Sequence, residues 1–321
     1  VYLIYADEKS EELQKYRIEN LNYLINKTND NLRKGICYYN IGNILITYKG
    51  SNIQKSVQYY FKSRKFDPNY ENRHYWWYEL AGLMFEKKHY KISESFYRKS
   101  LQLKISSAYT GVLRFEKKSS PKLIYLLIAD CLFMQGKFIE AHKLFEEHYS
   151  ETNLYYEYIL KDMVCIHLIE MKLGNVILDK KKSLTICEKI LLISKDEEII
   201  LLLKKAVKLD PLNSLAWFNL GIALNQTKEF EESLVCFIVS GVIVTGDKEA
   251  QFNALFICLH QRNLERFQVL IHYIIEKHGK MIANDFTDYI MKQNYTFDFK
   301  QQMLKAFTEF FEVHKNIKNN S

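Results

Sequence analysis

The chain has 321 residues, and its 48% hydrophobic content is enough to bury a substantial core, as one extended array or as two domains. Only 11 Gly and 3 Pro are present, which argues against sandwiches and barrels, because their many tight turns use these residues. The net charge of +7 is spread along the chain on lysines, so it is weak evidence for a nucleic-acid partner. We therefore expect a helical protein.

The cysteines occur singly, without the spacing of a disulfide framework or a zinc site, so we interpret them as buried small side chains in a reducing, cytoplasmic compartment. They are Cys37, Cys131, Cys165, Cys187, Cys236 and Cys258. The longest apolar stretch, near Leu234 to Val244, is shorter than the roughly 20 residues of a membrane-spanning helix, so we expect no membrane partner. The chain starts at Val1 without an initiator Met, and we expect it to be excised from a longer protein.

In chain order, residues 1–34 are expected to form an N-terminal cap, in which Glu11 to Asn29 is an amphipathic helix. Four segments of about 34 residues then share one pattern of side chains. They begin near Gly35, His74, Lys122 and Ser214. The first two fill 35–107, the third fills 122–155, and the fourth opens 214–281. Such internal repetition predicts an array of similar units.

Each of the four segments carries a large ring, then an aliphatic residue, then a small residue, and its second half carries a small residue and an aromatic four positions later. The columns are Tyr38, Trp77, Tyr125, Trp217, then Gly42, Ala81, Ala129, Gly221, then Ser56, Ser93, Ala141, Ser233, and finally Tyr60, Tyr97, Phe145, Phe237. The spacing predicts two helices per segment that cross at the small residues. Serine is tolerated there because its hydroxyl can bond back to the preceding turn of its own helix.

The remaining parts of the chain depart from this pattern. Residues 108–121 are read as an insertion whose end, Ser120 and Pro121, starts a helix. In 156–213 we expect a long helix ending near Gly174, a lysine cluster and a degenerate repeat from Lys180. A second degenerate repeat starts at Lys248 and completes 214–281, and residues 282–321 are expected to form C-terminal capping helices.

The columns resemble the tetratricopeptide repeat, which combines a W-x-x-L-G-x-x-Y opening, an A-x-x-x-F element and a boundary proline. Trp217, Leu220 and Gly221 match the opening, and Ala206 and Pro211 match the closing element. The resemblance implies an all-α, right-handed α–α superhelix with helical caps at both ends. It also implies a non-catalytic scaffold that binds a peptide or a partner domain in a concave groove.

The resemblance further implies which positions of each first helix line the groove. These are Tyr39, Asn43, Ile46, Tyr78, Gly82, Phe85, Leu126, Asp130, Phe133, Phe218, Ile222 and Asn225. Family members that clamp the terminal carboxylate of chaperones carry Lys, Arg and Asn at several of these positions, and here only Asn43 fits, together with the nearby Asn40. Chaperone docking is therefore disfavoured, and the aromatic and aliphatic groove favours an apolar peptide or an amphipathic helix.

We find no phosphate-binding loop, nucleophile elbow or zinc-binding helix, and so predict no catalytic residue, no cofactor and no metal. His167 and His272 each lie one helical turn before a glutamate, and we expect each pair to be structural or solvated. One alternative is the regulatory or sensing part of a larger enzyme whose catalytic domain precedes Val1. Another is a nucleic-acid scaffold, which would use the lysine runs at Lys87 and Lys88, Lys117 and Lys118, and Lys180 to Lys182.

Overall fold

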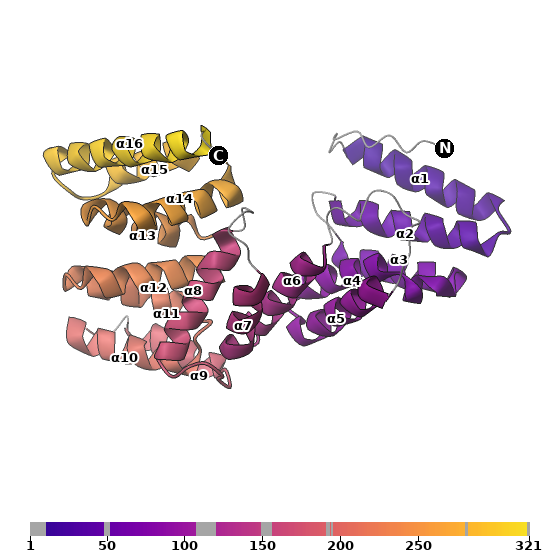
Figure 1. Ribbon diagram of the computed structural model, residues 1–321, viewed down its shortest axis with the longest axis horizontal. Helices are drawn as coiled ribbons and strands as arrows, with labels where there is room; N and C mark the ends of the chain where they lie inside the picture. The colour runs from indigo at the N-terminus through magenta and orange to yellow at the C-terminus, as the bar shows by residue number, and fades with distance from the viewer. Residues whose placement is uncertain are drawn as a thin grey trace. The chain divides into compact units, whose positions relative to one another are not determined.

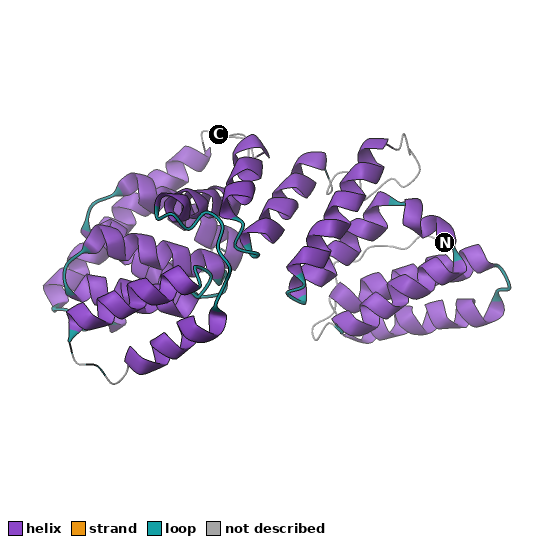
Figure 2. Ribbon diagram, turned by 90° about the horizontal axis from the view of Figure 1, so that it is seen from below, coloured by secondary structure: helices purple, strands orange, loops and turns teal. Residues whose placement is uncertain are grey.

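Helices joined by short turns make up the computed structural model, which describes residues 11–47, 52–106, 120–148, 156–190, 193, 195–279 and 282–319. Within these residues the strand-like geometry is limited to an isolated bridge between Lys137 and Asn175 (Figure 2). The predicted all-α class is confirmed. The chain divides into two compact units, residues 1–135 (unit 1) and 136–321 (unit 2).

Unit 1 is a stack of antiparallel helices that follow one another in chain order (Figure 1). Its elements are α1 (Glu11–Lys27), α2 (Asn31–Thr47), α3 (Ile53–Phe66), the short 3-10 helix η1 (Pro68–Asn72), α4 (His74–Glu86), α5 (Tyr90–Ser106) and α6 (Pro121–Phe133). Helix α2 packs on α3, and α4 packs on α5, which gives the predicted helix pairs of the first two repeats. The Ser120 side chain caps α6 by accepting a 3.1 Å bond from the Leu123 amide, as expected for a helix that starts at Pro121.

Unit 2 contains further stacked pairs, which include both degenerate repeats and the C-terminal cap (Figure 1). Its helices are α7 (Phe138–His148), α8 (Tyr156–Glu170), α9 (Lys180–Lys189), α10 (Asp196–Leu209), α11 (Ser214–Gln226), α12 (Phe230–Ile243), α13 (Lys248–His260), α14 (Leu264–His278), α15 (Ile282–Lys292) and α16 (Phe297–Asn319). Helices α9 and α10, α11 and α12, α13 and α14, and α15 and α16 pack as consecutive pairs.

Small residues lie where the paired helices cross, as the sequence columns predict. A Cβ atom added to Gly221 would come within 3.0 Å of the Phe237 ring, and one on Gly42 would come equally close to Tyr60. The serines at these crossings do not bond back to their own helices, so that expectation is wrong. The hydroxyls of Ser56, Ser93 and Ser233 instead donate across the crossing, at 2.7 to 2.8 Å, to the backbone carbonyl of the small residue in the first helix.

Four of the turns, those that follow α4, α8, α11 and α13, share one backbone geometry. Each places a basic residue in the left-handed region, namely Lys88, Lys172, Lys228 and Arg262. In the turn at Lys88, the next amide, that of His89, donates to the Met84 carbonyl five residues earlier, which satisfies the end of α4. Lys172 makes the same turn, so α8 ends at Glu170, in the same way as the first helices of the repeats. The predicted end near Gly174 is four residues too late.

Helix α8 fills a structural role inside unit 2 that the repeat pattern does not supply. It packs on α7 and also on α12 and α14. The Glu157 carboxylate accepts a 2.8 Å bond from the buried Lys161 ammonium and pairs with Lys277 of α14. Burial alone would raise the pKa of Glu157, but the two ammonium groups outweigh it and lower the pKa to about 2. The cover that α8 provides explains why α12 is apolar on nearly all sides.

Candidate functional site

A cavity of about 200 Å³ lies in unit 2, along the edge where first helices turn into second helices. It is lined by the end of α11, the start of α12, the last turn of α13, and the turn between α15 and α16 together with the first residues of α16. The lining residues are Asn225, Gln226, Lys228, Phe230, Phe256, Ile257, His260, Tyr295 and Phe299. We call these residues the aromatic pocket.

The walls of the aromatic pocket are rings that contact one another. Phe256 and Tyr295 are stacked with ring centroids 5.4 Å apart, and Tyr295 lies 4.9 Å from Phe299. On the other side, Phe230 lies 4.9 Å from His260, which in turn lies 5.9 Å from Phe299. Rings held in this way present a rigid apolar surface, because the neighbouring rings restrict their side-chain torsions.

Besides the His260 imidazole and the Tyr295 hydroxyl, the pocket has polar groups at the end of α11 and in its turn. Asn225 and Gln226 carry amide groups, and Lys228 brings an ammonium group without a carboxylate among the lining residues. Lys228 occupies the left-handed region, with φ of 66°, and its amide donates to the Asn225 carbonyl at 3.1 Å. The site therefore combines an apolar interior with hydrogen-bond donors at one end.

The size of the aromatic pocket limits its occupant. A cavity of about 150 Å³ in another protein accommodates benzene, and sites for whole drug-sized ligands start at about 300 Å³. At about 200 Å³ the pocket is matched to one aromatic or branched aliphatic side chain.

The groove residues predicted in unit 2 all lie on α11. Asn225 lines the aromatic pocket, while Phe218 and Ile222 are half-buried on the same helix. The Phe218 ring packs edge-on against Phe237 at 5.6 Å. Phe256 was not predicted, although it occupies the column of Ile222 in the repeat that starts at Lys248. Tyr295 and Phe299 were not predicted either, because they belong to the cap and have no repeat column.

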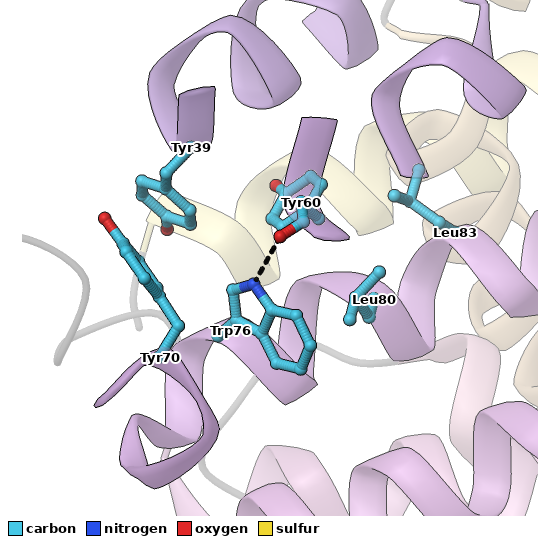
Figure 3. Packing of buried hydrophobic residues seen from close by; sticks show 6 residues of the cluster. All are labelled: Tyr39, Tyr60, Tyr70, Trp76, Leu80 and Leu83. Atoms are coloured by element: carbon cyan, nitrogen blue, oxygen red, sulfur yellow. Dashed lines mark hydrogen bonds between the residues drawn. The ribbon is translucent and has the colours of Figure 1, made fainter. Parts of the chain in front are cut away.

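The groove residues predicted on α2 and α4 have mixed positions. Tyr39 is 8% exposed and packs against Tyr60 and Tyr70 (Figure 3), whereas Asn43, Ile46 and Gly82 are half-buried. Tyr78 and Phe85 are also half-buried, and each ring contacts a ring of α5, with centroids 5.7 and 5.1 Å apart. Truncating these two rings would therefore loosen a helix pair as well as change a surface.

The groove residues predicted on α6 lie in the core. Leu126, Asp130 and Phe133 are at most 7% exposed, so they do not form an accessible groove surface as the resemblance implied. The physical reason is that α6 is buried over most of its surface, including the face on which these positions lie.

A cluster of polar side chains in unit 1 escaped the sequence analysis because it depends on Glu79 of α4. The Tyr39 hydroxyl donates to one Glu79 carboxylate oxygen at 2.9 Å, and the Tyr60 hydroxyl lies 2.7 Å from the other. The Tyr60 hydroxyl also makes a short hydrogen bond with the amide oxygen of Asn43. Burial raises the pKa of Glu79 to about 7, although the tyrosine hydrogen bonds oppose this rise.

The other residues considered for metal binding, catalysis or nucleic-acid binding make contacts within the fold. Among the described residues no group of three metal-ligating side chains is found, and no described helix is long and apolar enough to cross a membrane. His167 packs against Trp217, and His272 packs against Tyr156. All six cysteines are buried and free, as expected. Lys180 to Lys182 open α9, and Lys182 pairs with Asp179 at 2.8 Å, while Lys117 and Lys118 lie outside the described residues.

Comparison with known proteins identifies one repeat directly. Residues 202–234 match the family model of the tetratricopeptide repeat. No curated protein matches the chain. Among solved structures, the TPR2AB domain of yeast Sti1 in complex with pHSP90 is similar over 86% of this chain and 98% of its own, at 10% identity and a TM-score of 0.32. YrrB, described as a TPR protein with an unusual peptide-binding site, is similar over 86% of this chain and 100% of its own, at 14% identity and a TM-score of 0.26.

Proposed function

We propose that the chain, whose residues 202–234 match the family model of the tetratricopeptide repeat, is a non-catalytic scaffold that binds a peptide or protein partner. Its unit 2 anchors the partner by one apolar side chain in the aromatic pocket. The observation that carries the proposal is the pocket itself, in which five rings surround a space of one side chain's size. Residues 202–234, which match the family model, include the pocket's Asn225, Gln226, Lys228 and Phe230.

The polar end of the pocket gives the peptide a direction. Carbonyl oxygens of the peptide would accept hydrogen bonds from the amides of Asn225 and Gln226, and Lys228 would attract a carboxylate or a further carbonyl. The ring of Phe297, which is 66% exposed at the start of α16, does not line the pocket. The peptide needs few ordered side chains to bind, because a few buried aromatic anchors contribute most of the affinity in such complexes.

A displayed library of random peptides, selected on the purified chain, provides the test. We expect the selected peptides to share one aromatic or branched aliphatic residue. Replacing Phe256 and Tyr295 together with alanine should weaken the best peptide by about 30-fold or more, which corresponds to at least about 2 kcal/mol. Phe297→Ala, which removes a more exposed ring outside the lining, is the matched control and should change the affinity little.

Two outcomes would contradict this function. A library that yields no peptide above background would remove the binding role of the chain. Selected peptides whose affinity survives the Phe256 and Tyr295 substitutions, in a variant that keeps its helical circular dichroism, would place binding outside the aromatic pocket.

A further inference from the structure

The outer face of α1 exposes two aromatic rings. Helix α1 is the outermost described helix in the stack of unit 1, and it packs on α2 (Figure 1). Its Ile18, Leu21 and Ile25 side chains pack in the apolar cluster that the two helices share. On the opposite face of the helix, Tyr16 is 61% exposed and Tyr23 is 62% exposed. Burying rings of this size against a partner surface is favourable.

The two rings belong to one stripe along the helix. Tyr16 and Tyr23 are two helical turns apart, so they point in nearly the same direction. Glu12 lies one turn before the rings, Lys27 lies one turn after them, and both are exposed. We call these four residues the α1 stripe. Together with Leu24, which is 48% exposed, α1 exposes three large hydrophobic side chains, more than any other helix that the structure describes.

The order of side chains in the α1 stripe is complementary to a second copy of itself. Consider two α1 helices that pack antiparallel about a twofold axis between residues 19 and 20. Tyr16 then lies opposite Tyr23 of the second copy, because both are equally far from the axis. Glu12 lies opposite Lys27 of the second copy for the same reason. Each contact occurs twice, so rings meet rings in the middle of the pair and opposite charges meet at both ends.

The charges of the α1 stripe select the antiparallel arrangement. A parallel pair would bring Glu12 beside Glu12 and Lys27 beside Lys27, and these like charges would repel each other. In the antiparallel pair, the Lys27 ammonium, which lies 5.7 Å from the centroid of the Tyr23 ring, has a carboxylate opposite it. The Asn20 amide group lies opposite Glu19 of the second copy and can donate to its carboxylate.

We infer that α1 is a self-association surface through which two copies of this chain pair antiparallel. The contact joins two helices that are each about 25 Å long, so the dimer is weak and exchanges with the monomer. A dimer carries two aromatic pockets, so a partner with two anchoring side chains binds it more tightly than it binds the monomer. The inference does not depend on the proposed function, because α1 belongs to unit 1 and the aromatic pocket to unit 2.

Sedimentation velocity of the full chain at increasing concentration tests the surface. We expect the average mass to rise from monomer towards dimer as the chain concentration approaches about 100 μM, the scale of a weak protein contact. Replacing Tyr16 and Tyr23 together with alanine should weaken the dimer at least about tenfold. Phe61→Ala is the matched control, because it removes a 43% exposed ring from α3 of the same unit and leaves α1 unchanged.

Exchanging the charges tests the antiparallel register. Glu12→Lys alone sets lysine against lysine across the pair, and Lys27→Glu alone sets glutamate against glutamate. Each variant should therefore stay monomeric at concentrations at which the parent dimerises. An equimolar mixture of the two variants restores opposite charges at both ends and should recover the dimer. Mixing alters neither chain, so a loss of helix stability from the substitutions cannot explain the recovery.

Several results would overturn the inference. One is a parent chain that stays monomeric over the whole concentration range. Another is a dimer that is as tight without the Tyr16 and Tyr23 rings as with them, which would place the interface elsewhere. A single charge variant that dimerises like the parent, or a mixture of the two that stays monomeric, would rule out the antiparallel pair. Peptide binding by the aromatic pocket is tested separately by the peptide library, so the two proposals fail independently.

Discussion

Ser233 donates its hydroxyl proton to the backbone carbonyl of Gly221 at 2.7 Å, across the crossing of α11 and α12. Ser93 makes the same bond to Ala81, at 2.7 Å, between α4 and α5. Both serines are fully buried, so each hydroxyl would have to give up water without replacement if the bond were absent. The serine of these columns is therefore a link between the two helices of a unit.

Replacing Ser233 with alanine should lower the free energy of unfolding by about 1 kcal/mol, because the cross-helix hydrogen bond is lost while the Gly221 carbonyl keeps its partner within the helix. Ser63→Ala is the control, since the buried Ser63 hydroxyl bonds to the Tyr60 carbonyl of its own helix and links no second helix. Urea unfolding of the two variants measures the difference. Equal losses would mean that the crossing bond adds nothing beyond ordinary burial.

Replacing Gly221 with leucine should overpack the same crossing. A Cβ atom at this position would lie 3.0 to 3.1 Å from three atoms of the Phe237 ring, so a larger side chain must displace the ring. We expect a loss of about 1 to 3 kcal/mol in the free energy of unfolding. Ala141, which is also fully buried, should respond to the same substitution. Gly246→Leu is the control because nothing lies within 4 Å of its added Cβ, and a loss as large there would sink the packing argument.

A substitution in the left-handed turn at Lys88 is expected to raise the free energy of unfolding, whereas the two substitutions above lower it. Its φ is 61°, a region that costs a non-glycine residue about 1 kcal/mol or more. Lys88→Gly should therefore stabilise unit 1 by about 0.5 to 1 kcal/mol. Lys87→Gly is the matched control, because Lys87 is exposed as well but has an ordinary φ of −78°, and there glycine should destabilise slightly. Thermal unfolding of the parent and both variants measures these effects. A melting temperature of Lys88→Gly below that of the parent would contradict the backbone strain at Lys88.

The helix pairs could be predicted from the sequence because small and aromatic residues recur at fixed spacing, and this local pattern sets the crossing of α11 and α12. Tyr39 shows where the pattern ends. The repeat column of Tyr39 predicts a position on the groove. In the structure, Tyr70 of η1 packs over the Tyr39 ring with the ring centroids 5.3 Å apart, so Tyr39 is buried. That contact joins residues of different elements, and no spacing along the chain encodes it.

The aromatic pocket was predicted only in part for a related reason. Asn225 follows from its repeat column, and Phe256 could have been found by applying the same columns to the degenerate repeat at Lys248. Tyr295 and Phe299 could not, because the capping helices carry no repeat pattern that fixes their register. Helix α8 was likewise visible as a helix, but its position on α12 and α14 depends on Glu157 meeting Lys277, which lie far apart in the sequence.

The last prediction concerns the stability of unit 1 as the pH changes. Burial raises the pKa of Glu79 from 4.5 to about 7, so the folded chain holds this proton between those values while the unfolded chain has lost it. The free energy of unfolding should therefore fall as the pH rises from about 4.5 to 7, and Glu79 should contribute no further change above that. The loss is at most about 3 kcal/mol, which is the free-energy equivalent of this shift in pKa.

Comparing the parent chain with Glu79→Gln isolates this contribution, because the other titrating groups are common to both. The glutamine cannot ionise, so the variant should be more stable than the parent at pH 8 and differ little from it at pH 5. In a Trp217→Phe background the remaining tryptophans, Trp76 and Trp77, both lie in unit 1, and their fluorescence follows the unfolding of that unit alone. The stability difference between parent and variant could instead be the same at pH 5 and pH 8. That result would show that Glu79 is ionised throughout and would contradict the raised pKa.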